Sequence, residues 1–213
     1  MKITKLEHAC LDITNGPSRL VIDPGAFAGS LTNLEGITAL VITHVHQDHF
    51  DVDKVTQLLT ASPEVQVFTT QQVAEKLQGA KVTVPQLDKQ YSVGNFTLEF
   101  FGGAHDFIFD GLQTPQDQNY GVLVNDRLYY PGDSFAACPK PHTVLAVPGN
   151  APWMKVEEAR VFMEADPSQM VFPTHNGFVN EAGQGLIDRL LGGRAQETGR
   201  AYHSLKPGES IEV

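Results

Sequence analysis

The chain has little cysteine and no long hydrophobic run. Its two cysteines, Cys10 and Cys138, lie far apart and outside any C-x-x-C motif, which excludes a disulfide-stapled scaffold. No apolar stretch approaches the roughly 20 residues of a membrane span. The N-terminal residues 1–7 also lack the apolar core of a secretion signal. We therefore expect a cytoplasmic protein that has no membrane partner and keeps both thiols as reduced core side chains.

Positive charge is also scarce. Lysine and arginine together number 15 against 25 aspartates and glutamates, which gives a formal net charge of −10. A long nucleic acid needs a basic footprint, so we expect no nucleic-acid partner. A small anionic substrate stays compatible with this charge, because bound metal ions would supply local positive charge. The G-x-S-x-G motif is absent as well, which argues against a serine-hydrolase nucleophile.

The remaining pattern is typical of one α/β domain over residues 1–213. Short apolar runs predict strands at residues 3–7, 10–14, 19–22, 39–43, 65–69, 81–84, 95–101, 120–124, 127–130, 144–147, 170–173 and the C-terminus. Caps and helical spacing predict helices at residues 51–60, 71–78, 156–163 and around 185–191. Because strands precede helices in each half, we expect layered, mixed sheets.

One hexapeptide carries most of the functional information. His44-Val45-His46-Gln47-Asp48-His49 matches H-x-H-x-D-H and places four metal-ligand side chains within six positions. It follows a short apolar run at residues 39–43 that predicts a buried strand. His44 and His46 can reach one ion, while Asp48 and His49 can turn to a second. This arrangement favours a dinuclear metal site on a rigid base.

Each ion needs at least three protein ligands, so further ligands must come from elsewhere in the chain. Three candidates each follow an apolar run: His105, Asp133 and His175. Ligands usually gather where strands end at one edge of an α/β sheet. We therefore expect these three side chains to meet the hexapeptide.

In this order of ligands the chain resembles the metallo-β-lactamase superfamily. The resemblance covers residues 1 to about 180 and implies a four-layer αββα sandwich, with two mixed sheets flanked by helices. It implies one ion held by His44, His46 and His105. It implies a second ion held by Asp48, His49 and His175, with Asp133 bridging the two. These seven residues are His44, His46, Asp48, His49, His105, Asp133 and His175.

Within that superfamily the chain looks most like small hydrolases related to ascorbate-6-phosphate lactonase. Residues 1–9, the pair Asp23-Pro24 and residues 205–209 carry this likeness, although Glu7 stands where those proteins have glycine. The likeness places His8 near the metals, and a structural histidine in a strand explains it equally well. It is also compatible with a homo-oligomer.

These observations predict a hydrolase of a small ester, lactone or phosphoester. Two divalent ions about 3.5–4 Å apart can share a water and lower its pKa, so that a metal-bridging hydroxide attacks the substrate. Asp48 would be the catalytic residue that orients the hydroxide and takes its proton. Zn²⁺ is the expected metal, with Mn²⁺ or Fe as alternatives. The alternative function is a non-catalytic member of the fold that binds metal or a small molecule.

Related activities fit less well. A nuclease would need an RNA-gripping arm, and a di-iron oxygenase would carry glutamate where this chain has His46. A glyoxalase-type thioesterase would need more chain after His175, and true β-lactamases lack the bridging aspartate.

Several roles stay open at this point. Asp23 is a candidate acceptor for a ligand's second N–H, and Asp106 is a weaker one. Trp153 is expected either to wall a pocket or to anchor the next helix. Loops 25–38, 103–118 and 148–155 are expected to shape the substrate pocket.

Overall fold

The first of two sheets is built from the N-terminal half of the chain and the last strand. A computed structural model describes residues 1–29, 31, 33, 35–77, 79–109 and 116–213. The strand order is β14-β1-β2-β3-β4-β5-β6. The bounds are β1 Lys2–Lys5, β2 Leu11–Asn15, β3 Ser18–Ile22, β4 Ala39–Ile42, β5 Gln66–Thr69, β6 Val82–Thr83 and β14 Ser210–Glu212. The pairs from β14 to β3 are antiparallel and those from β3 to β6 are parallel, so the sheet is mixed.

The second sheet repeats this plan in the order β13-β12-β11-β10-β9-β8-β7. Its strands are β7 Tyr91–Val93, β8 Phe96–Gly102, β9 Tyr120–Val124, β10 Leu128–Tyr130, β11 Val144–Pro148, β12 Met170–Thr174 and β13 Ala201–Tyr202. The pairs from β7 to β10 are antiparallel and those from β10 to β13 are parallel. Strands β7 and β13 were not predicted from the sequence.

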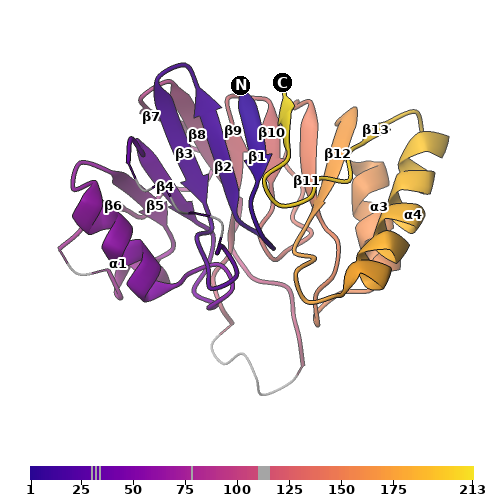
Figure 1. Ribbon diagram of the computed structural model, residues 1–213, viewed down its shortest axis with the longest axis horizontal. Helices are drawn as coiled ribbons and strands as arrows, with labels where there is room; N and C mark the ends of the chain where they lie inside the picture. The colour runs from indigo at the N-terminus through magenta and orange to yellow at the C-terminus, as the bar shows by residue number, and fades with distance from the viewer. Residues whose placement is uncertain (30, 32, 34, 78, 110–115) are drawn as a thin grey trace.

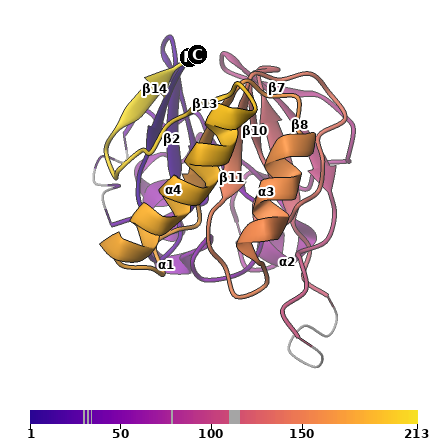
Figure 2. The same cartoon turned by 90° about the vertical axis from the view of Figure 1, so that its right-hand side faces the viewer.

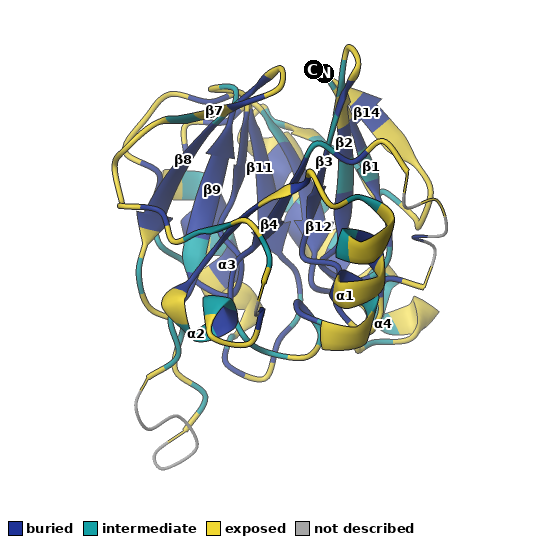
Figure 3. Cartoon of the chain, turned by 90° about the vertical axis from the view of Figure 1, so that its left-hand side faces the viewer, coloured by how far each residue is buried: buried dark blue, intermediate teal, exposed yellow. Residues whose placement is uncertain are grey.

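Helices cover the outer face of each sheet (Figure 1). The helices α1 Val52–Ala61 and α2 Gln71–Ala74 lie on the first sheet (Figure 3), and α3 Val156–Ala165 and α4 Glu181–Glu197 lie on the second (Figure 2). Three apolar clusters separate these layers: one between the sheets, and one under each helix pair. The predicted four-layer sandwich is confirmed. None of the described helices is both long and apolar enough to cross a bilayer.

One predicted helix start is confirmed, and two other predicted helices have different bounds in the structure. As predicted, Asp51 caps α1, and its side chain accepts a hydrogen bond from the amide of Lys54 at 3.0 Å. The predicted helix at 71–78 is wrong beyond Ala74, and residue 78 lies outside the described residues. The helix predicted around 185–191 begins earlier, where Asn180 caps it, and runs to Glu197.

The first strand also ends earlier than predicted. It stops at Lys5, and the chain then turns through His8, whose φ of 55° is outside the range of an extended strand. This turn brings His8 to the edge at which β4, β8, β10 and β12 lead into the predicted ligands.

Candidate metal centre

The structure brings all seven predicted ligands together at one edge of the two sheets. The ligand atoms of His44, His46 and His105 lie within 4.8 Å of one another. A second group, within the same limit, contains Asp48, His49 and His175.

Asp133 lies between these two groups. Its Oδ1 is 3.0 Å from His49 Nε2, and its Oδ2 is 3.0 Å from His175 Nε2 and 3.4 Å from His105 Nε2. The carboxylate therefore contacts members of both groups, as a bridging ligand would.

The hexapeptide is held in place by the loop that follows β3. Its backbone turns so that the amides of His49 and Phe50 both donate to the carbonyl of His46, at 3.0 and 2.8 Å. A Cβ on Gly25 would lie 1.9 Å from the carbonyl oxygen of Asp48. Only glycine leaves space for the two segments to pack this closely.

The buried donor atoms fit metal ions. The Nε2 atoms of His44, His49 and His175 and the Oδ1 atom of Asp133 are buried, and none makes a hydrogen bond within the described part of the chain. Unsatisfied buried polar atoms are rare and costly in proteins. Imidazole nitrogens with carboxylate oxygens are also the donor set that suits zinc and its neighbours. A pair of divalent ions would satisfy these atoms.

Asp23 organises the interior side of the centre, as the sequence suggested. Its Oδ2 accepts hydrogen bonds from His49 Nδ1 at 2.6 Å and from the hydroxyls of Thr43 at 2.7 Å and Tyr130 at 2.8 Å. The Thr43 hydroxyl lies 3.0 Å from His44 Nδ1. Because Asp23 accepts at Nδ1 of His49, the Nε2 lone pair of that ring is directed to the centre.

The other ligand rings are oriented in the same way. The Nδ1 atoms of His105 and His175 donate to the backbone carbonyls of Asp106 and Asn150. His46 uses Nε2 instead, which lies 2.9 Å from Asp117 Oδ2, so Nδ1 is left for a metal. Sequence reasoning missed Asp117 because only the fold brings it to His46.

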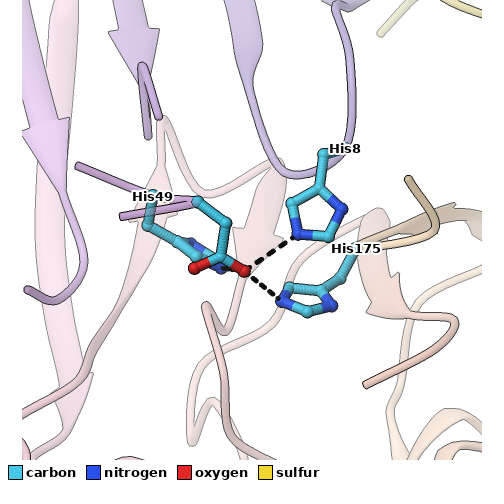
Figure 4. Close-up of side chains that lie close together, drawn as sticks. His8, His49 and His175 are labelled. Carbon is cyan, nitrogen blue, oxygen red and sulfur yellow. Dashed lines mark hydrogen bonds and ion pairs between the residues drawn. The ribbon is translucent and has the colours of Figure 1, made fainter. Parts of the chain in front are cut away.

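His8 joins the site as a hydrogen-bond donor. Its Nδ1 accepts the amide N–H of Gly177 at 3.0 Å, so in the neutral ring Nε2 carries the proton. That Nε2 lies 3.1 Å from Asp48 Oδ2, and His175 Nε2 lies 3.2 Å from the same oxygen. Figure 4 shows His8, His49 and His175 gathered around this carboxylate, with the two contacts dashed. His8 therefore positions Asp48.

Of the two side chains whose roles the sequence left open, one contacts a predicted ligand and the other contacts the loop beside it. Trp153 is buried and donates from Nε1 to Asp133 Oδ2 at 2.8 Å. Asp106 accepts the amide of Phe135 at 2.7 Å and thereby fixes the loop that follows Asp133. His142 lies outside the centre, where it contacts Asp166.

The electrostatics of the centre favour cations. Burial alone would raise the pKa of Asp48, but the close contacts with the His175 and His8 rings outweigh it and hold that pKa well below its ordinary value. The imidazoles around Asp133 hold its pKa low in the same way. Burial lowers the pKa of His44 well below 6.5. Against the effect of burial, the neighbouring carboxylates raise the pKa of His49 well above 6.5 and that of His175 to about 9, so metal binding would displace protons from these two rings.

Known proteins share this fold and sequence pattern. The family model described as a beta-lactamase superfamily domain matches residues 2–175. Protein Rv0786c of Mycobacterium tuberculosis is 31% identical over 191 residues, which cover 87% of this chain and 89% of that protein. The UPF0173 metal-dependent hydrolase TTHA1283 of Thermus thermophilus is 28% identical and covers 100% of this chain and 99% of its own.

A solved structure supports the same fold. Igni18, a metallo hydrolase from Ignicoccus hospitalis, superposes with a TM-score of 0.75 at 16% identity, over 100% of this chain and 98% of its own. The family match spans most of the chain, including all seven predicted ligands. The chain therefore belongs to the metallo-β-lactamase superfamily.

Proposed function

We propose that this protein is a metal-dependent hydrolase whose centre binds two divalent ions. His44, His46 and His105 would hold one ion, and Asp48, His49 and His175 the other, with Asp133 shared between them. The observation that carries this proposal is the convergence of unsatisfied buried donor atoms from both sheets on one edge. The hydrolase named among the relatives supports the same assignment.

Bound divalent ions would supply Lewis acidity and lower the pKa of a shared water from about 15.7 toward about 7. The carboxylate of Asp48 would accept the proton of this water. Asp48 is partly exposed, and its contacts with His8, His175 and His49 all use Oδ2. The other oxygen is left to orient a nucleophilic water and take its proton.

The substrate class is a small ester, lactone or phosphoester. The acidic net charge of −10 supports a small molecule over a nucleic acid. The nitrogen-rich donor set supports Zn²⁺, with Mn²⁺ or Fe as alternatives. Two free cysteines in the described chain support a reducing compartment such as the cytoplasm.

Two measurements test this proposal. Elemental analysis of protein purified without added metal should find two divalent ions per chain. The same protein should hydrolyse at least one member of a panel of lactones, carboxylic esters and phosphodiesters. Metal-loaded protein that turns over no member of the panel would instead support a non-catalytic binding protein.

The variant Asp48→Asn tests the assigned role within this proposal. Loss of the proton acceptor should lower kcat by about 100-fold or more. The matched control is Asp53→Asn, on the first turn of α1 outside the centre. Equal kcat values for the two variants would contradict the role given to Asp48.

A further inference from the structure

A small cavity lies beside the metal centre and shares a wall with it. Its volume is about 200 Å³, and its lining includes Lys5, His8, Phe27, Asn176 and Gln184. His8 is the shared wall, because its Nε2 contacts Asp48 of the centre. A small molecule whose reacting group lies at the metals could therefore place its other end in this cavity.

The cavity contains a buried cation. Lys5 is only 2% exposed and shares a face of β1 with Ile3, which packs in the core between the sheets. Its stem is therefore buried against that core, and the ammonium lies at the edge of the sheets.

This ammonium is poorly compensated. Its single hydrogen bond among the described residues goes to Asn176 Oδ1 at 2.7 Å, although an ammonium has three donors. No ion pair of the described residues includes Lys5. Burial lowers its pKa to about 8, opposed by the charge of Asp188, so it is mostly charged at neutral pH. A buried charge without a direct ion pair is costly, and an anion bound in the cavity would lower this cost.

The other charged group of the lining limits which anion fits. Glu7 also lines the cavity, and its Oε2 accepts the amide of Gly29 at 2.8 Å. With one lysine and one glutamate on the walls, a singly charged carboxylate is favoured over a doubly charged phosphate. Gln184 adds an amide group, and the Phe27 ring lies 5.2 Å from the His8 ring and adds apolar surface.

We propose that Lys5 and Asn176 form a carboxylate-binding subsite that selects substrates with an acidic group at the end remote from the scissile bond. This inference rests on the proposed hydrolase function only in treating the bound carboxylate as part of a substrate. It narrows the substrate class to lactones or esters that carry a free carboxylate. The subsite itself can be tested by binding alone.

The experiment measures anion binding to the full-length, metal-loaded protein by isothermal titration calorimetry. The probes are propionate and methyl phosphate, and the variants are Lys5→Met and Lys5→Gln. Lys5→Met keeps the stem length, and Lys5→Gln keeps a donor for Asn176. The matched control is Lys2→Met, an exposed lysine on the same strand.

Propionate should bind the wild type and Lys2→Met alike and lose about tenfold or more in affinity in both Lys5 variants, with metal content and circular dichroism unchanged. Anion binding at the metals is common to all four proteins and does not produce this difference. Equal affinity across the four proteins would overturn the subsite. If methyl phosphate binds more tightly than propionate, and this binding is lost in the Lys5 variants, the carboxylate assignment would be overturned.

Turnover separates this inference from the proposed function. In an active enzyme, the Lys5 variants should raise KM for a carboxylate-bearing ester and leave KM for its neutral analogue unchanged. Turnover of neutral and acidic esters with identical KM in wild type and variants would remove the subsite while leaving the hydrolase intact. Lys5-dependent propionate binding without any turnover would support the subsite and contradict the hydrolase function.

Discussion

At the residue scale, the centre depends on side chains that orient the ligand rings. Asp117 holds His46 through Nε2, and Asp23 holds His49 through Nδ1. Both carboxylates fix which ring nitrogen carries a proton, and so which one can bind a metal. The candidate centre therefore includes orienting side chains as well as the seven predicted ligands.

The variant Asp117→Ala isolates this orienting effect. Without its partner, the His46 ring is free to rotate, and affinity for the ion near His44 and His105 should fall by about 10- to 100-fold. Competition with a metal chelator measures this affinity. Asp53→Ala, a change on α1 away from the centre, is the control. Unchanged affinity in Asp117→Ala would show that the His46–Asp117 contact does not orient the ligand.

The seven candidate ligands could be predicted from sequence because each follows an apolar strand and four lie within one hexapeptide. Asp117, Tyr130 and Lys5 could not, because their partners are distant in sequence. Tyr130, for example, reaches Asp23 across 107 positions. The loops expected to shape the pocket contribute Phe27 to the cavity, whereas its lysine, Lys5, comes from the first strand.

At the scale of elements, the turn from β10 to β11 and the end of α3 are joined by a buried pair. His142 Nε2 contacts both oxygens of Asp166, at 2.9 and 3.1 Å, and Nδ1 donates to the carbonyl of Lys140 at 2.9 Å. Both nitrogens therefore act as donors, as they do in a protonated ring.

This pair predicts a pH-dependent stability. Burial would lower the pKa of His142, but the hydrogen bond to Asp166 outweighs it and raises the pKa from 6.5 to about 10. The stabilisation is therefore complete below pH 6.5 and is lost as the pH rises through about 10. The variant His142→Gln should lose about 2 kcal/mol of unfolding free energy below pH 6.5, and the difference from wild type should shrink near pH 10. Urea denaturation across this range measures it, and a difference that is constant with pH would contradict the assignment.

The packing of the loop after β3 on the hexapeptide gives a second prediction. In Gly25→Ala the new Cβ would lie 1.9 Å from the Asp48 carbonyl, so the loop must move. The variant should lose about 1–3 kcal/mol of stability and part of its metal affinity.

A control for this variant lies in α4. Apart from its chain neighbours and the backbone of α4 itself, no described atom lies within 4 Å of a Cβ built at Gly185, and Gly185→Ala should gain about 0.5–1 kcal/mol through helix propensity. Thermal unfolding and metal analysis of both variants check the pair. A Gly25→Ala protein as stable as Gly185→Ala would show that the contact is not restrictive.

Elements with regular patterns were predicted well, and those shaped by neighbours were not. The glycines of α4 hide its length, because glycine is a poor helix former and Gly192 is needed to pack against Tyr202. The two-residue strand β13 exists only because β12 pairs with it. The first strand was predicted too long because nothing in its local pattern shows the turn at His8.

At the scale of the whole molecule, the centre joins the two sheets. His44 follows β4 of the first sheet, whereas His105, Asp133 and His175 follow β8, β10 and β12 of the second. Ions held by both sets would cross-link the sheets at this edge. Layered, mixed sheets were predictable from the alternation of strands and helices, whereas the order of the four layers came from the resemblance to the metallo-β-lactamase superfamily. The pairing of β14 with β1 was not, because no local signal specifies that partner.

Metal removal should therefore lower global stability. Ligand present at a hundredfold excess over its Kd stabilises a fold by about 2.7 kcal/mol, so a chelator should lower the Tm of the wild type. The variant His44→Ala should show a smaller drop, because one of its ions is already weakly held. A Tm that does not change with chelator in wild type would mean that the centre does not link the sheets.

Three non-glycine residues of the centre, His8, Asp23 and His175, adopt positive φ angles of 55°, 49° and 55°. Left-handed backbone is tolerated best by glycine, asparagine and aspartate, and poorly by most other side chains. Mutational tolerance at these positions will therefore follow backbone conformation as well as chemistry. At His8, asparagine should preserve the turn better than glutamine does. In a deep mutational scan that measures protein abundance, His8→Asn should therefore be more abundant than His8→Gln, although glutamine is closer to imidazole in length.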